Sequence, residues 1–170
     1  MPYYAIHVKA RCEEKFLHRA GTRMDKARGK LVWPRRKLRI KKKGEWLDSL
    51  KPIFPGYLFL EAEEVSSDIY TTLRTIPGFL RFLPSNNSIT PLNRDDRELL
   101  THFLSFGEIV EKSQVFFDHN SRIRVVSGPL KGLEGKIVKV DRRKGRAKVK
   151  LDMCRNSFLI DFGFDALDRA

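Results

Sequence analysis

Residues 52–60, with the sequence PIFPGYLFL, constrain the fold more than any other stretch of the chain. The two prolines fix φ and remove backbone donors, which keeps the approach out of a helix, and Gly56 allows a sharp turn. The aromatic and aliphatic run that follows is short, and acidic residues end it. This pattern predicts a buried central strand. Phe54 and Tyr57 flank the turn, where we expect a side chain to reach the surface.

The segments before this strand predict a strand, a helix and a basic hairpin. Tyr3–Val8 is rich in aromatic and β-branched residues, which favour a strand. Apolar residues recur at helical spacing over residues 12–27, which predicts an amphipathic helix. The pattern over residues 31–40 is that of an extended strand, and Lys43-Gly44 has the composition of a tight turn. We therefore expect the chain to return as the second strand of a hairpin.

The segments after the central strand add two helices and one more strand. Ser66 or Ser67 can cap the first helix, and Asn93 can cap the second, whose first turn carries two aspartates that favour the helix dipole. A short apolar run over residues 79–83 predicts the strand between them. This mixture of strands and helices favours an α+β fold, with helices packed on an antiparallel sheet.

The pattern changes to all-β toward the C-terminus. Apolar and basic residues alternate over 122–125 and again over 146–151, which places Arg146, Lys148 and Lys150 on one face of a strand. With two further apolar runs and several tight turns, these segments predict a small barrel. Residues 107–120 have no clear periodicity. We therefore predict an N-terminal domain over residues 1–106, a linker over 107–117 and a C-terminal barrel over 118–170.

The charge of the chain is divided into blocks. The formal net charge is +13, to which residues 1–29 contribute +4, residues 30–51 contribute +7, residues 52–117 contribute −4 and residues 118–170 contribute +6. Basic blocks on either side of an acidic middle favour a polyanionic partner, and nucleic acid is the usual one.

Several classes of protein do not fit the sequence. No apolar run is long enough to cross a membrane, and the N-terminus lacks a basic stretch with an apolar core, so we expect neither a membrane span nor a signal peptide. Cys12 and Cys154 match no metal or redox spacing, which favours a reduced, cytoplasmic chain. The four histidines are scattered, and no P-loop glycine pattern occurs. We expect a monomeric binding protein with no metal, no cofactor and no catalytic site.

Two motifs resemble those of one family of transcription factors. Phe54-Pro55-Gly56-Tyr57 followed by an apolar strand resembles the N-terminal domain of NusG, and the segment VVSGPLKGLEGKI over residues 125–137 resembles its C-terminal KOW domain. In this order, the resemblance covers nearly the whole chain, and it implies an NGN-like N-terminal domain and an SH3-like C-terminal barrel. The basic segment over residues 33–46 is similar to that of the LoaP-type paralogues, which implies antitermination at selected operons and recognition of a nascent RNA hairpin.

The family resemblance also implies a docking site for RNA polymerase. In the family, the N-terminal domain binds the clamp helices of the largest subunit through a shallow apolar depression. The matching positions here are Tyr3, Phe54, Tyr57 and Tyr70. Tyrosine suits such a site because it buries a large ring and keeps a polar tip. The alternative is that these rings close the core of the domain itself.

A second set of candidates is basic and would bind nucleic acid. Clustered arginine and lysine on a small barrel are expected for a phosphate-binding surface, and a solvated basic face is the alternative. The barrel candidates are Lys131, Lys136, Arg142, Arg143, Lys144, Arg146 and Lys148, and the hairpin candidates are Arg35, Arg36 and Lys37.

The sequence leaves two other functions open. The basic hairpin can read exposed non-template DNA, or the chain can be a structural ribosomal-RNA-binding protein with a KOW segment. The general factor binds ribosomal protein S10 or the terminator Rho through apolar KOW positions, which correspond here to Leu130, Leu133, Met153 and Cys154. The family's aromatic residues are absent from these positions, which argues against both partners.

Overall fold

The computed structural model describes residues 1–168, which form two compact units. Unit 1 comprises Met1–Trp33 and Phe54–Leu99, and unit 2 comprises Pro34–Ile53 and the residues from Leu100 on. The hairpin segment within residues 34–53 therefore groups with the C-terminal strands, although its neighbours in sequence belong to unit 1. Within residues 1–168, no helix is both long and apolar enough to cross a membrane.

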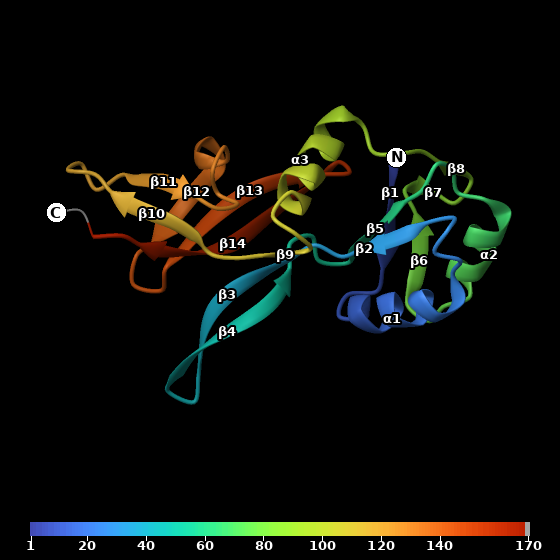
Figure 1. Ribbon diagram of the computed structural model, residues 1–170, viewed down its shortest axis with the longest axis horizontal. Helices are drawn as coiled ribbons and strands as arrows, with labels where there is room; N and C mark the ends of the chain where they lie inside the picture. Colours follow the sequence, from blue (N-terminus) through green and yellow to red (C-terminus); the bar gives the residue numbers. More distant parts are fainter. Residues whose placement is uncertain (169–170) are drawn as a thin grey trace. The chain divides into compact units, whose positions relative to one another are not determined.

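Unit 1 is built on a four-stranded antiparallel sheet (Figure 1). Its strand order is β2 (Lys30–Val32), β5 (Tyr57–Glu61), β1 (Tyr3–Val8) and β6 (Phe79–Phe82). Leu58, Phe59 and Leu60 of β5 are fully buried, so the predicted central strand is confirmed. A two-stranded ribbon of β7 (Pro84–Ser85) and β8 (Ser88–Ile89) follows β6.

Two helices, α1 (Glu13–Arg23) and α2 (Ser67–Arg74), cover one face of this sheet. Ile6 of β1 lies opposite Leu58 of β5, and both pack in one core cluster with Phe16 of α1 and Leu73 of α2. Helix α1 is shorter than the apolar pattern over residues 12–27 predicts. The reason is Asp25, whose side chain accepts a hydrogen bond from the backbone N–H of Ala27 at 2.9 Å and so stabilises a turn in place of the helix.

The predicted N-caps are confirmed. Ser66 accepts a hydrogen bond from the backbone N–H of Ile69 at 3.2 Å and begins α2. Asn93 accepts one from the backbone N–H of Asp96 at 2.8 Å and begins α3 (Arg94–Leu104). Each cap satisfies a donor that has no partner within its own helix.

Unit 2 contains a five-stranded sheet that forms the C-terminal barrel. Its order is β11 (Ile123–Ser127), β10 (Ser113–Phe117), β14 (Asn156–Ala166), β13 (Arg146–Met153) and β12 (Ile137–Asp141), and the 3-10 turn η1 (Glu134–Lys136) precedes β12. In β13, Ala147, Val149 and Leu151 are buried and the basic residues between them face outward, as the alternation predicts.

The structure differs from the expected linker. Residues 107–117 contain β9 (Ile109–Val110) and β10, and β10 lies between β11 and β14 in the barrel sheet. The strand was missed because its first inward position is polar: Ser113 is fully buried, and its hydroxyl oxygen accepts a hydrogen bond from the backbone N–H of Leu130 at 3.0 Å. The predicted linker over residues 107–117 therefore includes a strand of the barrel sheet, and the limits of the two domains stay a prediction.

The predicted basic hairpin is present as β3 (Arg35–Lys42) and β4 (Glu45–Pro52), and β9 pairs in parallel with β3. Lys42 pairs with Glu45, so the turn has two central residues, Lys43 and Gly44. Both have positive φ, 51° and 80°. This is the geometry of a type I′ turn, whose twist matches that of the two strands.

Candidate nucleic-acid interface and aromatic face

The rings of Phe54 and Tyr57 lie on the face of the unit 1 sheet opposite α1 and α2. Tyr57 pairs with His7, one residue out of phase with the helix-facing pair of Ile6 and Leu58. The rings of Tyr57 and His7 stack with centroids 5.0 Å apart, and Phe54 meets Phe59 edge to face at 5.8 Å. Phe54 is 1% exposed and Tyr57 is 5% exposed, so the expectation that both reach the surface beside the turn is wrong.

Tyr3 and Tyr70 lie on opposite faces of the same sheet. Tyr3 pairs with Glu61 in phase with Tyr57, and it is half-buried beneath the guanidinium of Arg97 at 5.8 Å. Burial raises the pKa of the Tyr3 hydroxyl, and the negative charge of Glu61 raises it further. Tyr70 is on α2 and packs on the helix side against Phe82. The structure thus places Tyr3, Phe54 and Tyr57 on one face and separates Tyr70 from them.

The turn before β5 depends on a residue that the sequence did not single out. Gly56 has φ +84°, and its backbone N–H donates to the Glu13 carboxylate at 3.4 Å. Glu13 is 4% exposed, which is unusual for a carboxylate. Glu13 connects the start of α1 to the approach of the central strand. An acidic residue in the first turn of an amphipathic helix is too common a signal to have revealed this role.

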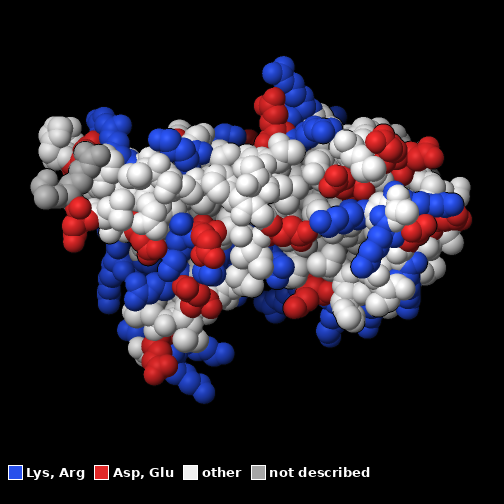
Figure 2. All heavy atoms as spheres, viewed as in Figure 1, with Lys and Arg blue, Asp and Glu red and all other residues white. Residues whose placement is uncertain are grey.

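The outward face of the barrel carries the predicted basic cluster. Arg146, Lys148 and Lys150 alternate with buried residues on β13, and Lys139 of β12 lies directly opposite Lys148. A depression of about 120 Å³ lies here, lined by Lys139, Asp141, Lys144, Arg146, Lys148 and Asp161. In Figure 2, Lys and Arg side chains gather at the lower left, over the turn between β12 and β13 and over the hairpin.

The remaining barrel candidates differ in how free their charges are. Arg143 and Lys136 are exposed. The guanidinium of Arg142 lies over the ring of Phe117, 4.0 Å from its centroid, and Lys131 donates from Nζ to the carbonyl oxygen of Val125 at 3.1 Å. Arg143 and Lys136 are therefore more available to a ligand than Arg142 and Lys131.

Two of the predicted nucleic-acid residues hold the hairpin to the barrel within unit 2. Arg146 donates from Nη2 to the carbonyl oxygen of Arg39 at 2.8 Å. Arg36 is 9% exposed and donates to the carbonyl oxygens of Asp161 and Pro52. Burial lowers the pKa of Arg36 to about 10, and the negative charge of Asp161 opposes this shift. The enclosed side chain argues against contact of Arg36 with nucleic acid, which stays a prediction.

The other hairpin candidates are also engaged at its base. Lys37 forms an ion pair with Glu111 at 2.8 Å, and Arg35 is half-buried. The exposed cations of the hairpin lie nearer its tip, at Arg39, Lys41, Lys42 and Lys43. Trp46, the last residue of the segment that resembles the LoaP-type paralogues, lies among them with 37% of its surface exposed.

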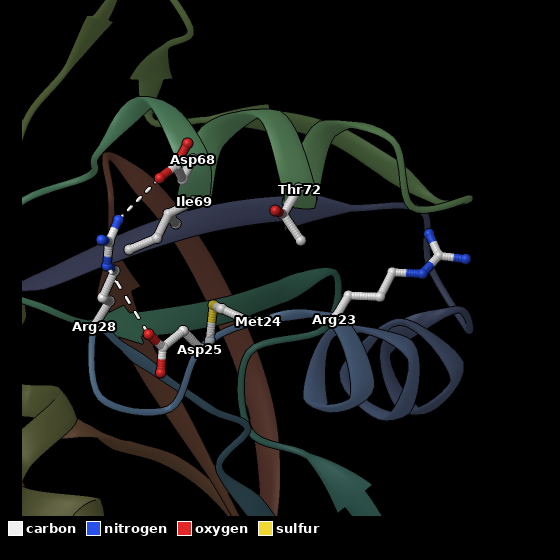
Figure 3. A pocket seen from close by; sticks show the side chains of 7 residues that line it. All are labelled: Arg23, Met24, Asp25, Arg28, Asp68, Ile69 and Thr72. Carbon is white, nitrogen blue, oxygen red and sulfur yellow. Dashed lines mark hydrogen bonds and ion pairs between the residues drawn. The ribbon is translucent and has the colours of Figure 1, made fainter.

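Unit 1 has an open hollow of about 230 Å³ between the end of α1 and α2 (Figure 3). Arg28 bridges Asp68 at 2.9 Å and Asp25 at 3.9 Å across it, while Arg23 points away from this ion pair. These pairs are exposed and contribute little to stability. Within residues 1–168, no group of three or more His, Cys, Asp or Glu residues is placed to hold a metal ion.

Comparison with protein families gives two matches that follow one another along the chain. A family model described as transcription termination factor nusG matches residues 1–101, and a KOW motif model matches residues 120–151. A solved structure described as domain interaction in Thermotoga maritima NusG covers 95% of this chain and 93% of its own, with a TM-score of 0.60 and 19% identity. These matches confirm the predicted fold class, an α+β NusG N-terminal domain with a C-terminal all-β KOW domain.

Curated relatives carry the name transcription termination/antitermination protein NusG. The protein of Thermus thermophilus is 25% identical over 183 residues, covering 99% of this chain and 98% of the relative. The protein of Bacillus subtilis is 26% identical over 122 residues, covering 70% of this chain and 67% of the relative. With a family model that matches more than half of its length, the chain belongs to the NusG family of transcription termination/antitermination factors.

Proposed function

We propose that this NusG-like factor is a processive antiterminator of the LoaP type. Its N-terminal domain, residues 1–106, docks on RNA polymerase, and its KOW domain, whose limits we now extend to include β10, binds a hairpin in the nascent RNA. The observation that carries this proposal is the basic depression on β12 and β13.

The arrangement of charges in this depression favours an anionic ligand. Lys139 and Lys148 lie directly opposite each other on neighbouring strands, and Asp161 lies opposite Lys148 on its other side. The lining of four cations and two carboxylates leaves an excess of positive charge, which is unfavourable until an anion binds. Arg143 and Lys144 add two exposed cations at the adjoining turn. Asp141 and Asp161 also line the hollow, and their carboxylates can accept hydrogen bonds from 2′-hydroxyl groups, which DNA lacks. Phosphates of a folded RNA satisfy the cations, and the carboxylates favour RNA over DNA.

The test is a titration of a structured hairpin from a candidate target leader against a scrambled duplex, at two salt concentrations. Lys148→Ala and Arg143→Ala should each weaken binding and reduce the salt dependence by about one counterion. Arg143→Lys should restore only part of the affinity, because lysine cannot reproduce two parallel hydrogen bonds to phosphate. Arg122→Ala is the matched control, since it removes one exposed charge outside the depression. Equal affinity for both RNAs would exclude the barrel as the source of specificity.

Polymerase docking is proposed for the sheet face that carries Tyr3, Phe54 and Tyr57. Apolar aromatic residues that share one face suit a helical partner such as the clamp helices. Docking requires the rings of Phe54 and Tyr57 to become accessible, since both are buried. Tyr3→Ala should weaken polymerase binding by at least about 2 kcal/mol if its ring is an anchor. Tyr70→Ala is the control, because that ring lies on the helix side of the sheet; equal loss in both variants would refute this face as the site.

Rho and ribosomal protein S10 are not included among the proposed partners. Leu130, Leu133 and Met153 are each at most 6% exposed and line the barrel interior instead of offering an apolar docking surface. The second candidate function is reading of non-template DNA by the hairpin, and the exposed cations near the hairpin tip favour it.

A further inference from the structure

Two exposed apolar residues lie on the outer face of the barrel sheet, beside the basic depression. Val138 of β12 is 56% exposed, and Leu159 of β14 is 61% exposed. Strand β13 lies between these two strands (Figure 1), and its residue Lys150 pairs with Leu159. The stem of a lysine adds apolar surface while its amine stays in water. Val138, Lys150 and Leu159 therefore form one patch across three strands, which we term the apolar strip.

A bulge in β12 places Val138 and Lys139 on the same side of the sheet. Ile137 pairs with Val149 and Lys139 pairs with Lys148, so β12 has one residue more than β13 over this step. That extra residue is Val138. Val149 is buried, whereas Val138 and Lys139 are both exposed. Bulges that re-aim a side chain in this way are common beside functional sites.

The apolar strip is continuous with the basic depression. Lys148 lines the depression, and it is two residues from Lys150 along β13, a step of about 7 Å. Lys148 pairs with Asp161 and Lys150 pairs with Leu159, so the two rows are adjacent on both strands. A nucleotide whose phosphate lies at Lys148 can therefore place its base on the strip.

Phosphate binding does not account for the exposed apolar side chains. A base within a helix is covered on both faces, whereas a base that leaves the stack exposes a face that packs against apolar side chains. A protein partner fits the strip less well, because the centres of protein interfaces are depleted of lysine. Here Lys150 lies on the middle strand of the patch, where its charge complements a phosphate next to the base.

We infer that the apolar strip binds one unpaired base of the RNA hairpin, next to the phosphate held at the basic depression. This inference rests on the proposed function and specifies its ligand as a stem interrupted by an unpaired nucleotide. Phosphate contacts carry no sequence information. A base that leaves the stem at one position gives the barrel a means to distinguish one hairpin from another.

The test measures binding of the full chain to three RNA hairpins with the same stem and loop. The first is fully paired, the second has one unpaired adenosine in the stem, and the third has an abasic nucleotide at that position. The adenosine hairpin should bind roughly 4- to 15-fold more tightly than the paired one, the factor for burying the equivalent of one or two methylene groups. The abasic hairpin keeps the flexible backbone but lacks the base, so it should bind like the paired one.

Three variants separate base packing from phosphate binding. Leu159→Ala should abolish most of the preference for adenosine and change the affinity for the paired hairpin less than about twofold. Lys148→Ala should weaken binding of all three hairpins by a similar factor, because it removes a phosphate contact. Leu167→Ala is the matched control, since Leu167 is 44% exposed but lies beyond the end of β14; it should leave all three affinities within about twofold.

Equal binding of the three hairpins by the unmodified chain would overturn the inference and leave the strip to a protein partner. Abasic binding as tight as adenosine binding would also overturn it, as would a full preference for adenosine in Leu159→Ala. The comparison of hairpins by the unmodified chain decides the question even if a variant does not fold. If no hairpin binds, the proposed function fails as well, whereas equal binding of all three refutes only the site for an unpaired base.

Discussion

The anchoring of the hairpin by Arg36 predicts a measurable loss of local stability when this side chain is replaced. The lowering of the pKa of Arg36 to about 10 corresponds to a cost of about 3 kcal/mol for the charged form in its buried site. Its hydrogen bonds to the carbonyls of Asp161 and Pro52 contribute about 1.5–3 kcal/mol each, because the donor is charged. The net stabilisation is therefore about 0–3 kcal/mol.

Arg36→Met keeps most of the apolar volume and removes both the charge and the donors. We expect hairpin opening to become easier by about 1–2 kcal/mol, near the middle of that range. Arg36→Ala also loses the contact with the ring of Phe162 at 5.8 Å, so it should cost about 2 kcal/mol more.

Hydrogen exchange of peptides covering residues 35–52 measures this loss directly, because the hairpin can open without global unfolding. The methionine variant should lower hairpin protection about tenfold, a factor equivalent to about 1.4 kcal/mol, and the alanine variant should lower it further. Peptides from β5 in unit 1 serve as the internal reference. Unchanged hairpin protection in Arg36→Ala would refute the anchoring role. Protection in Arg36→Met well above that of the unmodified chain would show that desolvation outweighs the hydrogen bonds.

Three further predictions concern the folds of the two units. Ser66→Ala removes the N-cap of α2 and should lower the free energy of unfolding by about 1 kcal/mol in a denaturant titration. Gly128→Ala should lower the free energy of unfolding by about 2–5 kcal/mol, because its φ is +102° and a Cβ would lie 2.6 Å from a backbone atom. Gly132→Ala, with φ +88° and open space around the Cβ, should lower it by about 1 kcal/mol. A fragment of residues 118–170, which lacks β10, should give a disordered circular dichroism spectrum, while 108–170 should give a folded one; a folded 118–170 would contradict the role assigned to β10.

Much of the fold was predictable because local signals and packing agree. The alternation in β13 has the same period as its burial, and Lys43-Gly44 supplies the positive φ that a two-residue hairpin turn needs. Strand β10 was missed because a buried serine interrupts its apolar pattern. The hydrogen-bond donor to this serine, the backbone N–H of Leu130, is distant in sequence. No local pattern reports such a contact.

The candidate sites were harder to predict because exposure depends on tertiary packing. Phe54 and Tyr57 flank a turn, yet both are buried. For Arg36 the sequence held a usable signal: it lies in phase with Leu38 and Ile40 and out of phase with Lys37, so alternation alone assigns it to the apolar side of β3. Counting charges over a run of basic residues conceals this difference, because the strand directs every second one inward.

The two-residue turn at Lys43 and Gly44 restricts how the hairpin can change length. The side chains of a strand alternate between its two faces. One residue added to β4 between the turn and Trp46 therefore moves Trp46 to the other face of the hairpin, away from Arg39 and Lys41. One residue added to each arm keeps the pairing and only lengthens the projection by about 3.4 Å. Relatives that keep the pairing of Lys41 with Trp46 should therefore differ in hairpin length by even numbers of residues.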